Sequence, residues 1–179
     1  IAISTKILDR ALNLEPPTIV IGEGKKILTR EDINQAKEKY GELINVIIAE
    51  SVEEIGLLAF KDCISLSEIA ISDSVTKIGW SAFCGCKSLK TVTIPNSVTE
   101  IDGHAFSDCT SLTEVTIPKL VTTIGSEAFS SCTSLTEVNF NAKNCIKMGW
   151  EFGAVFYACS NLKKLNIGNE VKTIPSYAF

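Results

Sequence analysis

The sequence returns to the same apolar positions at a nearly constant interval. Copies of one unit, LxxIxIxxxVxxIGxxAFxxCxS, begin at Leu66, Leu89, Leu112, Leu135 and Leu162, at intervals of 23, 23, 23 and 27 residues, and a partial copy precedes them from Leu43. Six of the eight phenylalanines occupy one position of the unit: Phe60, Phe83, Phe106, Phe129, Phe156 and Phe179. A repeat of about 20–50 residues is typical of a solenoid, in which each unit is one coil.

Each unit contains a short segment that alternates apolar and polar residues, as Val92-Thr93-Ile94 does. Alternation with a period of two predicts a strand with one buried face. The second half of the unit, with Ile78, Ala82 and Phe83 at spacings of four and five, predicts a short helical turn that crosses back over the core. Because one coil cannot bury its own apolar face, successive coils must stack, with parallel strands and a continuous interior. The predicted fold class is an α/β solenoid.

The unit resembles the BspA-like, or Treponema-type, leucine-rich repeat, which runs LxxIxIPxSVxxIGxxAFxxCxx. The stretch LKTVTIPNSVTEIDGHAFSDCTS matches that pattern at Leu89, Val92, Ile94, Pro95, Ser97, Val98, Ile101, Ala105, Phe106 and Cys109. The resemblance covers about residues 41–179 and implies a parallel sheet on a concave face with short helical turns on the convex face. The chain departs from the pattern at Leu120 and Glu170, which replace serine, and at Asp102, which replaces glycine. A longer coil between Cys145 and Phe156, with Val155 at the alanine position, predicts a bulge on the return side.

Two parts of the chain are expected, an N-terminal capping segment over residues 1–40 and a solenoid over residues 41–179 with about six coils of 23 residues. Thr29 can cap a helix over residues 30–40, since acidic residues follow it and Ile33, Ala36 and Tyr40 recur at helical spacing. Upstream, residues 18–21 are expected to form a strand, and Ile7, Leu8, Ala11 and Leu12 fit a short amphipathic helix. The sequence ends halfway through a coil, which predicts that further repeats follow.

Charge and composition argue against several classes of partner. The formal net charge is -4 and the pI about 5.1, with basic residues scattered, so nucleic acid is not an expected partner. No apolar run approaches the roughly 20 residues of a membrane span, and insertion into a membrane is not expected. No pattern of a signal peptide is visible.

The seven cysteines follow the repeat rather than a disulfide pattern. Five of them lie three residues after the repeated phenylalanine: Cys63, Cys86, Cys109, Cys132 and Cys159. Their position predicts small buried side chains. Neighbours would lie roughly 5 Å apart, which is within reach of a disulfide, but the odd total and the regular column favour free thiols. Cys84 and Cys145 lie outside the column, and Cys84 is expected to be exposed.

No catalytic residue, metal site or cofactor site is predicted. His104 is the single histidine and falls on the return side, where solvent is its expected neighbour. Glu114 and Glu137 share one position on successive strands, roughly 5 Å apart, and paired carboxylates can act as acid and base. Since the same position holds Thr91 and Lys164 in the flanking coils, a solvated ladder is the better interpretation.

The outward strand positions form a candidate binding surface on the concave sheet. Its candidate residues are Glu68, Lys90, Thr91, Thr93, Thr113, Glu114, Thr116, Thr136, Glu137, Asn139, Lys163, Lys164 and Asn166. Threonine is also a favourable strand residue, so a plain solvated face is the alternative. A second candidate is an apolar patch of Leu57, Leu58 and Trp80 on the return side, either a protein contact or a surface covered by residues 1–28.

The resemblance implies a non-enzymatic, protein-binding role in adhesion at the cell surface or after secretion, with host matrix proteins or other cells as partners. The alternative is a structural spacer, in which the repeats hold another domain of a larger protein at a distance. A repeat fold does not by itself identify a ligand.

Overall fold

A computed structural model describes residues 18–150 and 153–178 of the 179-residue chain. One helix, α2 (Arg30–Tyr40), and two sets of strands are present there. The first set, here called the main sheet, is β1 (Thr18–Ile21), β3 (Asn45–Ile48), β5 (Glu68–Ala70), β7 (Thr91–Thr93), β9 (Glu114–Ile117), β11 (Glu137–Phe140) and β13 (Lys164–Ile167). The second sheet is β2 (Ile27–Leu28), β4 (Glu54–Ile55), β6 (Lys77–Ile78), β8 (Glu100–Ile101), β10 (Thr123–Ile124) and β12 (Lys147–Met148).

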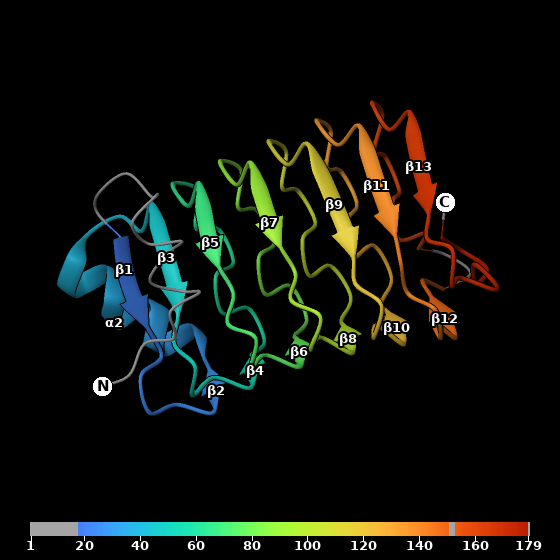
Figure 1. Ribbon diagram of the computed structural model, residues 1–179. Helices are drawn as coiled ribbons and strands as arrows, with labels where there is room; N and C mark the ends of the chain where they lie inside the picture. The colour runs from blue at the N-terminus through green and yellow to red at the C-terminus, as the bar shows by residue number, and fades with distance from the viewer. Residues whose placement is uncertain (1–17, 151–152, 179) are drawn as a thin grey trace.

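The chain forms the parallel solenoid that its repeat predicts. Strands of the main sheet stand side by side in chain order along the molecule, and the strands of the second sheet form a row along its lower edge (Figure 1). Pairing is parallel throughout both sheets, and the register links equivalent positions of successive coils, such as Val92 with Ile69. The main sheet divides between β7 and β9 into a four-stranded and a three-stranded part.

The return half of the coil differs from the expected helical turns. After each second-sheet strand, the described coils turn through residues in the left-handed region, with φ of 52° at Ser81, 54° at His104 and 55° at Glu127. A left-handed residue interrupts an α-helix. The backbone N–H of Phe83 donates to the Ala105 carbonyl of the next coil, at 2.7 Å, and is therefore not available to a carbonyl four residues back. The main chain on this side is satisfied between coils rather than within a helix.

The N-terminal region takes part in both sheets. β1 pairs with β3 and β2 pairs with β4, which confirms the expected strand at residues 18–21. Helix α2 then begins after Thr29, whose side chain accepts from the Asp32 N–H while the Asp32 carboxylate accepts from the Thr29 N–H, a capping box. The helix predicted for residues 30–40 is confirmed, and its Ile33 is fully buried in the common core. The helix expected around residues 7–12 lies outside the described residues.

Identical side chains stack through the interior. The rings of Phe60, Phe83, Phe106, Phe129 and Phe156 lie nearly parallel, with centroids of neighbouring rings 5.0–5.4 Å apart. The thiols of Cys86, Cys109, Cys132 and Cys159 each donate to the phenylalanine carbonyl of the preceding coil, at 3.0–3.2 Å. All seven cysteines are free, and the five of the column are buried as predicted. Cys145 is buried too, and Cys84 is only partly exposed.

The longer coil keeps the stack intact. The Phe129 N–H donates to the Val155 carbonyl as the Phe106 N–H does to Ala128, so Val155 does occupy the alanine position. Trp150 and Gly153 form an antiparallel bridge at the base of the inserted residues, and Trp150 is exposed.

We expect replacement of one stacked ring to destabilise the whole described stack. Phe106→Ala removes a ring that packs on both sides and leaves a cavity, and the free energy of unfolding should fall by about 3–5 kcal/mol. Urea denaturation followed by circular dichroism measures this loss. Lys87→Ala, an exposed position, is the control and should change it by no more than about 0.5 kcal/mol. A loss below about 1 kcal/mol for Phe106→Ala would contradict the packing.

We expect Cys84, which is partly exposed, to be alkylated before the buried Cys86 and Cys109 in the folded protein. Burial raises the pKa of the Cys86 and Cys109 thiols far above the usual value, so near pH 8 these thiols stay protonated and unreactive. Iodoacetamide labelling followed by peptide mass mapping, with and without urea, reads the order. Cys84→Ser should abolish the first labelling event, and labelling of Cys109 as fast as Cys84 in the native state would refute a closed interior.

Candidate interaction surface

Outward side chains of the main sheet align in columns, as expected for strands in register. Glu114 is paired with Glu137, and Glu137 with Lys164, while Thr116, Asn139 and Asn166 form the next column. On the other part of the sheet, Glu68 pairs with Thr91 and Ala70 with Thr93. The strand period of two turns these side chains away from the core residues between them. The structure therefore brings the predicted columns together, in two blocks that meet at β7 and β9.

In the first three strands of the main sheet, one of the two outward columns is apolar: Val20 of β1, Ile47 of β3 and Ala70 of β5. Ile47 and Ala70, outward in register, are only 2% and 4% exposed and pack with Val20 in a cluster separate from the main core. Sequence reasoning missed Ile47, although the unbroken apolar run of β3 carried a signal. A strand without alternation is one covered on both faces. Glu68 of β5 is already exposed, and in β7 both outward residues, Thr91 and Thr93, are polar and exposed.

A hydrogen-bonded polar group occupies the last two described strands. Glu137 accepts from Lys164 Nζ at 3.0 Å and from Asn166 Nδ2, which also reaches Asn139 Oδ1 at 2.7 Å. The hydrogen bond from Lys164 holds the pKa of Glu137 below its usual value. A carboxylate kept ionised in this way is a poor general acid near neutral pH. The pair Glu114 and Glu137 is therefore arranged as a polar surface, with Glu137 engaged by its neighbours.

A further column of equivalent residues lies just before the strands: Lys90, Thr113, Thr136 and Lys163. Its threonine hydroxyls bond to backbone carbonyls of the preceding coil. Thr136 Oγ1 donates to the Thr113 carbonyl at 3.1 Å, and Thr113 Oγ1 donates to the Lys90 carbonyl at 3.5 Å. These hydroxyls are partly engaged within the protein. Lys90 and Lys163 are exposed beside them.

The return-side patch is partly exposed. Leu57 is 60% and Trp80 48% exposed, while Leu58 is half-buried. The Trp80 ring lies over Gly103, where a Cβ atom would meet it at 2.4 Å, and contacts the His104 ring edge-on at a centroid distance of 4.9 Å. His104 Nδ1 is also 3.7 Å from a Glu127 carboxylate oxygen. The single histidine is thus packed between an indole and a carboxylate rather than solvated on all sides.

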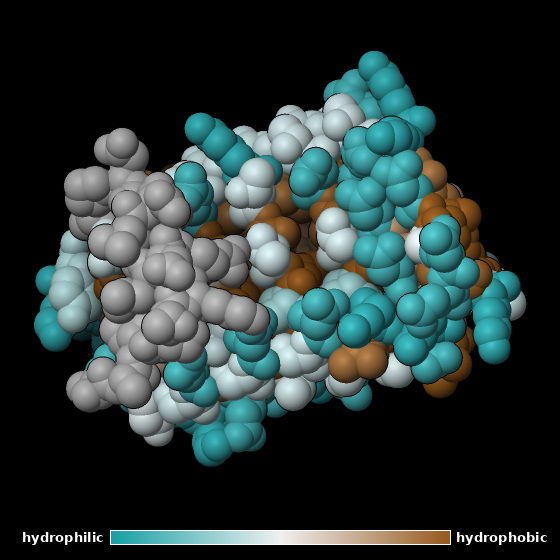
Figure 2. Space-filling view, viewed as in Figure 1, coloured by the Kyte–Doolittle hydropathy of each residue, from teal (hydrophilic) through white to brown (hydrophobic). Residues whose placement is uncertain are grey.

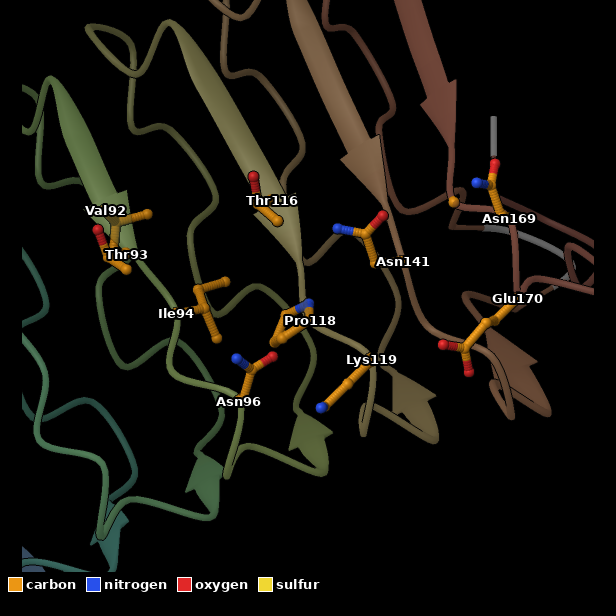
Figure 3. Close-up of a pocket in the computed structure, with 11 residues that line it drawn as sticks. Val92, Thr93, Ile94, Asn96, Thr116, Pro118, Lys119, Asn141, Asn169 and Glu170 are labelled. Atoms are coloured by element: carbon orange, nitrogen blue, oxygen red, sulfur yellow. The ribbon is translucent and has the colours of Figure 1, made fainter.

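A groove that sequence reasoning missed runs along the carboxyl ends of β7, β9, β11 and β13. It has a volume of about 530 Å³, with Ile94 and Pro118 on its floor and Thr93, Asn96, Thr116, Lys119, Asn141, Gly168, Asn169 and Glu170 along its rim. Figure 2 shows apolar surface at the bottom of a hollow in the middle of this face, bordered by polar side chains. In Figure 3, Asn141 extends from the end of β11 toward Thr116, and Asn96 and Lys119 approach each other below Pro118.

Pro118 lies where the main sheet divides. The N–H of Asn141 donates to the Ile117 carbonyl, and the N–H of Gly168 donates to the Phe140 carbonyl. Pro118 occupies the equivalent position one coil earlier, and proline has no N–H to donate. Among the described residues no backbone N–H reaches the Ile94 carbonyl, and β7 and β9 are not paired.

Other kinds of site find no support in the described residues. Across 18–150 and 153–178, no cluster of three or more His, Cys, Asp or Glu side chains is arranged to hold a metal ion. In the same part of the chain, no helix has the length and apolar character needed to span a membrane.

Comparison with known proteins agrees with this architecture. The model of the BspA type leucine rich repeat region matches residues 33–152 in six copies. The fold is similar to a leucine-rich repeat protein of T. pallidum, with 30% identity and a TM-score of 0.63, over 76% of this chain and 72% of that one. None of the curated protein sequences matches the chain.

Two larger proteins share the fold. One is a leucine-rich cell surface protein of Faecalibacterium prausnitzii (28% identity, TM-score 0.62, 68% of this chain and 31% of that one). The other is a leucine-rich repeat protein of Bacteroides ovatus (30% identity, TM-score 0.60, 75% of this chain and 40% of that one). This chain thus spans less than half the length of either protein. From its repeat, its stacked interior and these matches, the chain belongs to the BspA-type leucine-rich repeat family.

Proposed function

We propose that the chain is a non-enzymatic protein-binding module that acts at the cell surface or after secretion, in adhesion to host matrix proteins or other cells. The observation that carries this proposal is the polar face of the main sheet from β7 to β13. Thr91, Thr93, Glu114 and Thr116 are exposed there, while β7 and β9 bury Val92 and Val115 on their other side. Side chains held at regular spacing on a rigid scaffold can be complementary to a large partner.

The similarity to a cell surface protein of Faecalibacterium prausnitzii supports the location. A repeat-built surface that varies from coil to coil also suits a macromolecule better than a small substrate, because its groups are spread over several strands. The proposed partner is therefore a protein.

Charge reversal on this face should abolish binding. Glu114→Lys with Glu137→Lys places two cations where two carboxylates stand, and we expect capture of the partner to fall at least tenfold because the charge complementarity is reversed. The measurement is capture of purified host matrix proteins, fibronectin, laminin and collagen, by the immobilised chain, read by surface plasmon resonance.

Glu38→Lys with Glu42→Lys is the matched control. Both residues are exposed near the end of α2, at the opposite end of the molecule from β9 and β11 (Figure 1), and the change in net charge is the same. Binding lost equally in both variants would indicate a general charge effect, and binding unaffected by Glu114→Lys with Glu137→Lys would defeat the proposed surface.

We further infer that helix α2 caps the N-terminal end of the stack. In the coils that follow, the carbonyls of Ala82 and Cys84 accept from N–H groups of the preceding coil. The equivalent carbonyls of the coil next to α2 belong to Ala59 and Lys61, and both accept from the Arg30 guanidinium. A side chain of α2 thus does for this coil what a preceding coil does for the others.

Arg30→Met tests the cap. The aliphatic part of the side chain is retained, but two partly buried carbonyls lose a charged donor, and the free energy of unfolding should fall by about 1.5–3 kcal/mol. Urea denaturation measures the loss, and Arg30→Lys should restore part of it. An unchanged midpoint for Arg30→Met would show that the guanidinium is dispensable.

A further inference from the structure

We propose that the groove at the carboxyl ends of β7, β9, β11 and β13 binds an extended peptide segment with an acidic side chain, which pairs with Lys119. This inference rests on the proposed protein-binding function and specifies the part of a partner that the chain would recognise. The groove begins at Thr93 and Thr116 of the outward columns and continues onto the turns that follow the strands (Figure 3).

The shape of the groove suits an extended chain. Its lining comes from four successive coils, from Thr93 in β7 to Gly168 after β13. Coils of a parallel sheet lie about 4.8 Å apart, so three intervals span about 14 Å, or about four residues of extended peptide at about 3.4 Å each. A peptide lying along the solenoid axis would contact each coil in turn.

The lining offers what a peptide main chain requires. Every peptide residue carries a donor and an acceptor that lose water on binding and need partners. The hydroxyls of Thr93 and Thr116 and the amides of Asn96 and Asn141 can each donate and accept. The Ile94 carbonyl, which Pro118 cannot serve, is a further acceptor at the floor for a peptide N–H.

The charges of the groove select an acidic side chain. Lys119 is exposed and makes no ion pair within the described residues, whereas Glu170 at the far end is 3.2 Å from Lys143. The positive charge of Lys119 is therefore available to a ligand, and complementary charge favours a carboxylate opposite it. Aromatic side chains, on which sugar rings commonly stack, are absent from the described lining, so the groove fits a peptide better than a glycan.

The test is an array of immobilised hexapeptides in which each position in turn carries Asp, Lys, Leu or Ser, probed with the whole chain. We expect peptides with a central Asp to bind at least about tenfold more strongly than the matched Lys peptides. Lys119→Glu should reverse this preference, and Asn96→Trp should reduce all peptide binding by filling the mouth of the groove. Lys87→Glu, an exposed lysine outside the groove, makes the same charge change and should bind as the unchanged chain does.

Three outcomes would overturn the proposal: an array without preference for acid, a preference that Lys119→Glu leaves intact, or a glycan array bound in a Lys119-dependent way in place of peptides. The function proposed above is tested separately. Suppose that a matrix protein is captured through Glu114 and Glu137, that acidic hexapeptides do not displace it, and that Lys119→Glu does not weaken its binding. This result would refute the groove proposal and leave the proposed protein-binding function intact.

Discussion

Every feature of this molecule depends on one coil stacking upon the next. The phenylalanine rings stack at 5.0–5.4 Å, and the backbone N–H groups of one coil, such as that of Phe83, reach the carbonyls of the following coil. The ring spacing is close to the roughly 4.8 Å between neighbouring β-strands, so a side chain that fits in one coil also fits in the next. The interior therefore repeats the same or a similar apolar residue in each column, and the side chains that face water vary most.

The same stacking explains which side chains donate to backbone carbonyls that receive no backbone N–H from a neighbouring coil. The cysteine thiols are small enough for the crowded interior and still reach the phenylalanine carbonyl of the preceding coil. Arg30 reaches two carbonyls of the coil beside α2. Pro118 has the opposite effect, because it has no N–H to donate. The Ile94 carbonyl therefore lacks a backbone donor, and Ile94 lines the groove. Single side chains thus take over, or leave unmade, contacts that a neighbouring coil makes elsewhere in the stack.

The sequence was sufficient for the columns and insufficient for the return half. Periodicity predicted the strands and the phenylalanine and cysteine columns, since each rests on spacing alone. It predicted helical turns where the structure has the second sheet, because a strand of two residues such as Glu100–Ile101 has no periodicity of its own and its partners lie a whole coil away. The groove escaped prediction for a related reason, as its walls belong to four coils that only the fold brings together.

Pro118 lines the groove and lies where the main sheet divides. Both Pro95 and Pro118 follow strands of the main sheet, whereas Asn141 and Gly168 take that place in the next coils and restore the backbone bond. Proline alone does not divide the sheet, because β5 and β7 pair although Pro95 has no N–H for the Ile71 carbonyl, whereas β9, β11 and β13 pair along their full length. Asn141 has two roles: its backbone N–H donates to the Ile117 carbonyl between β9 and β11, and its side chain lines the groove.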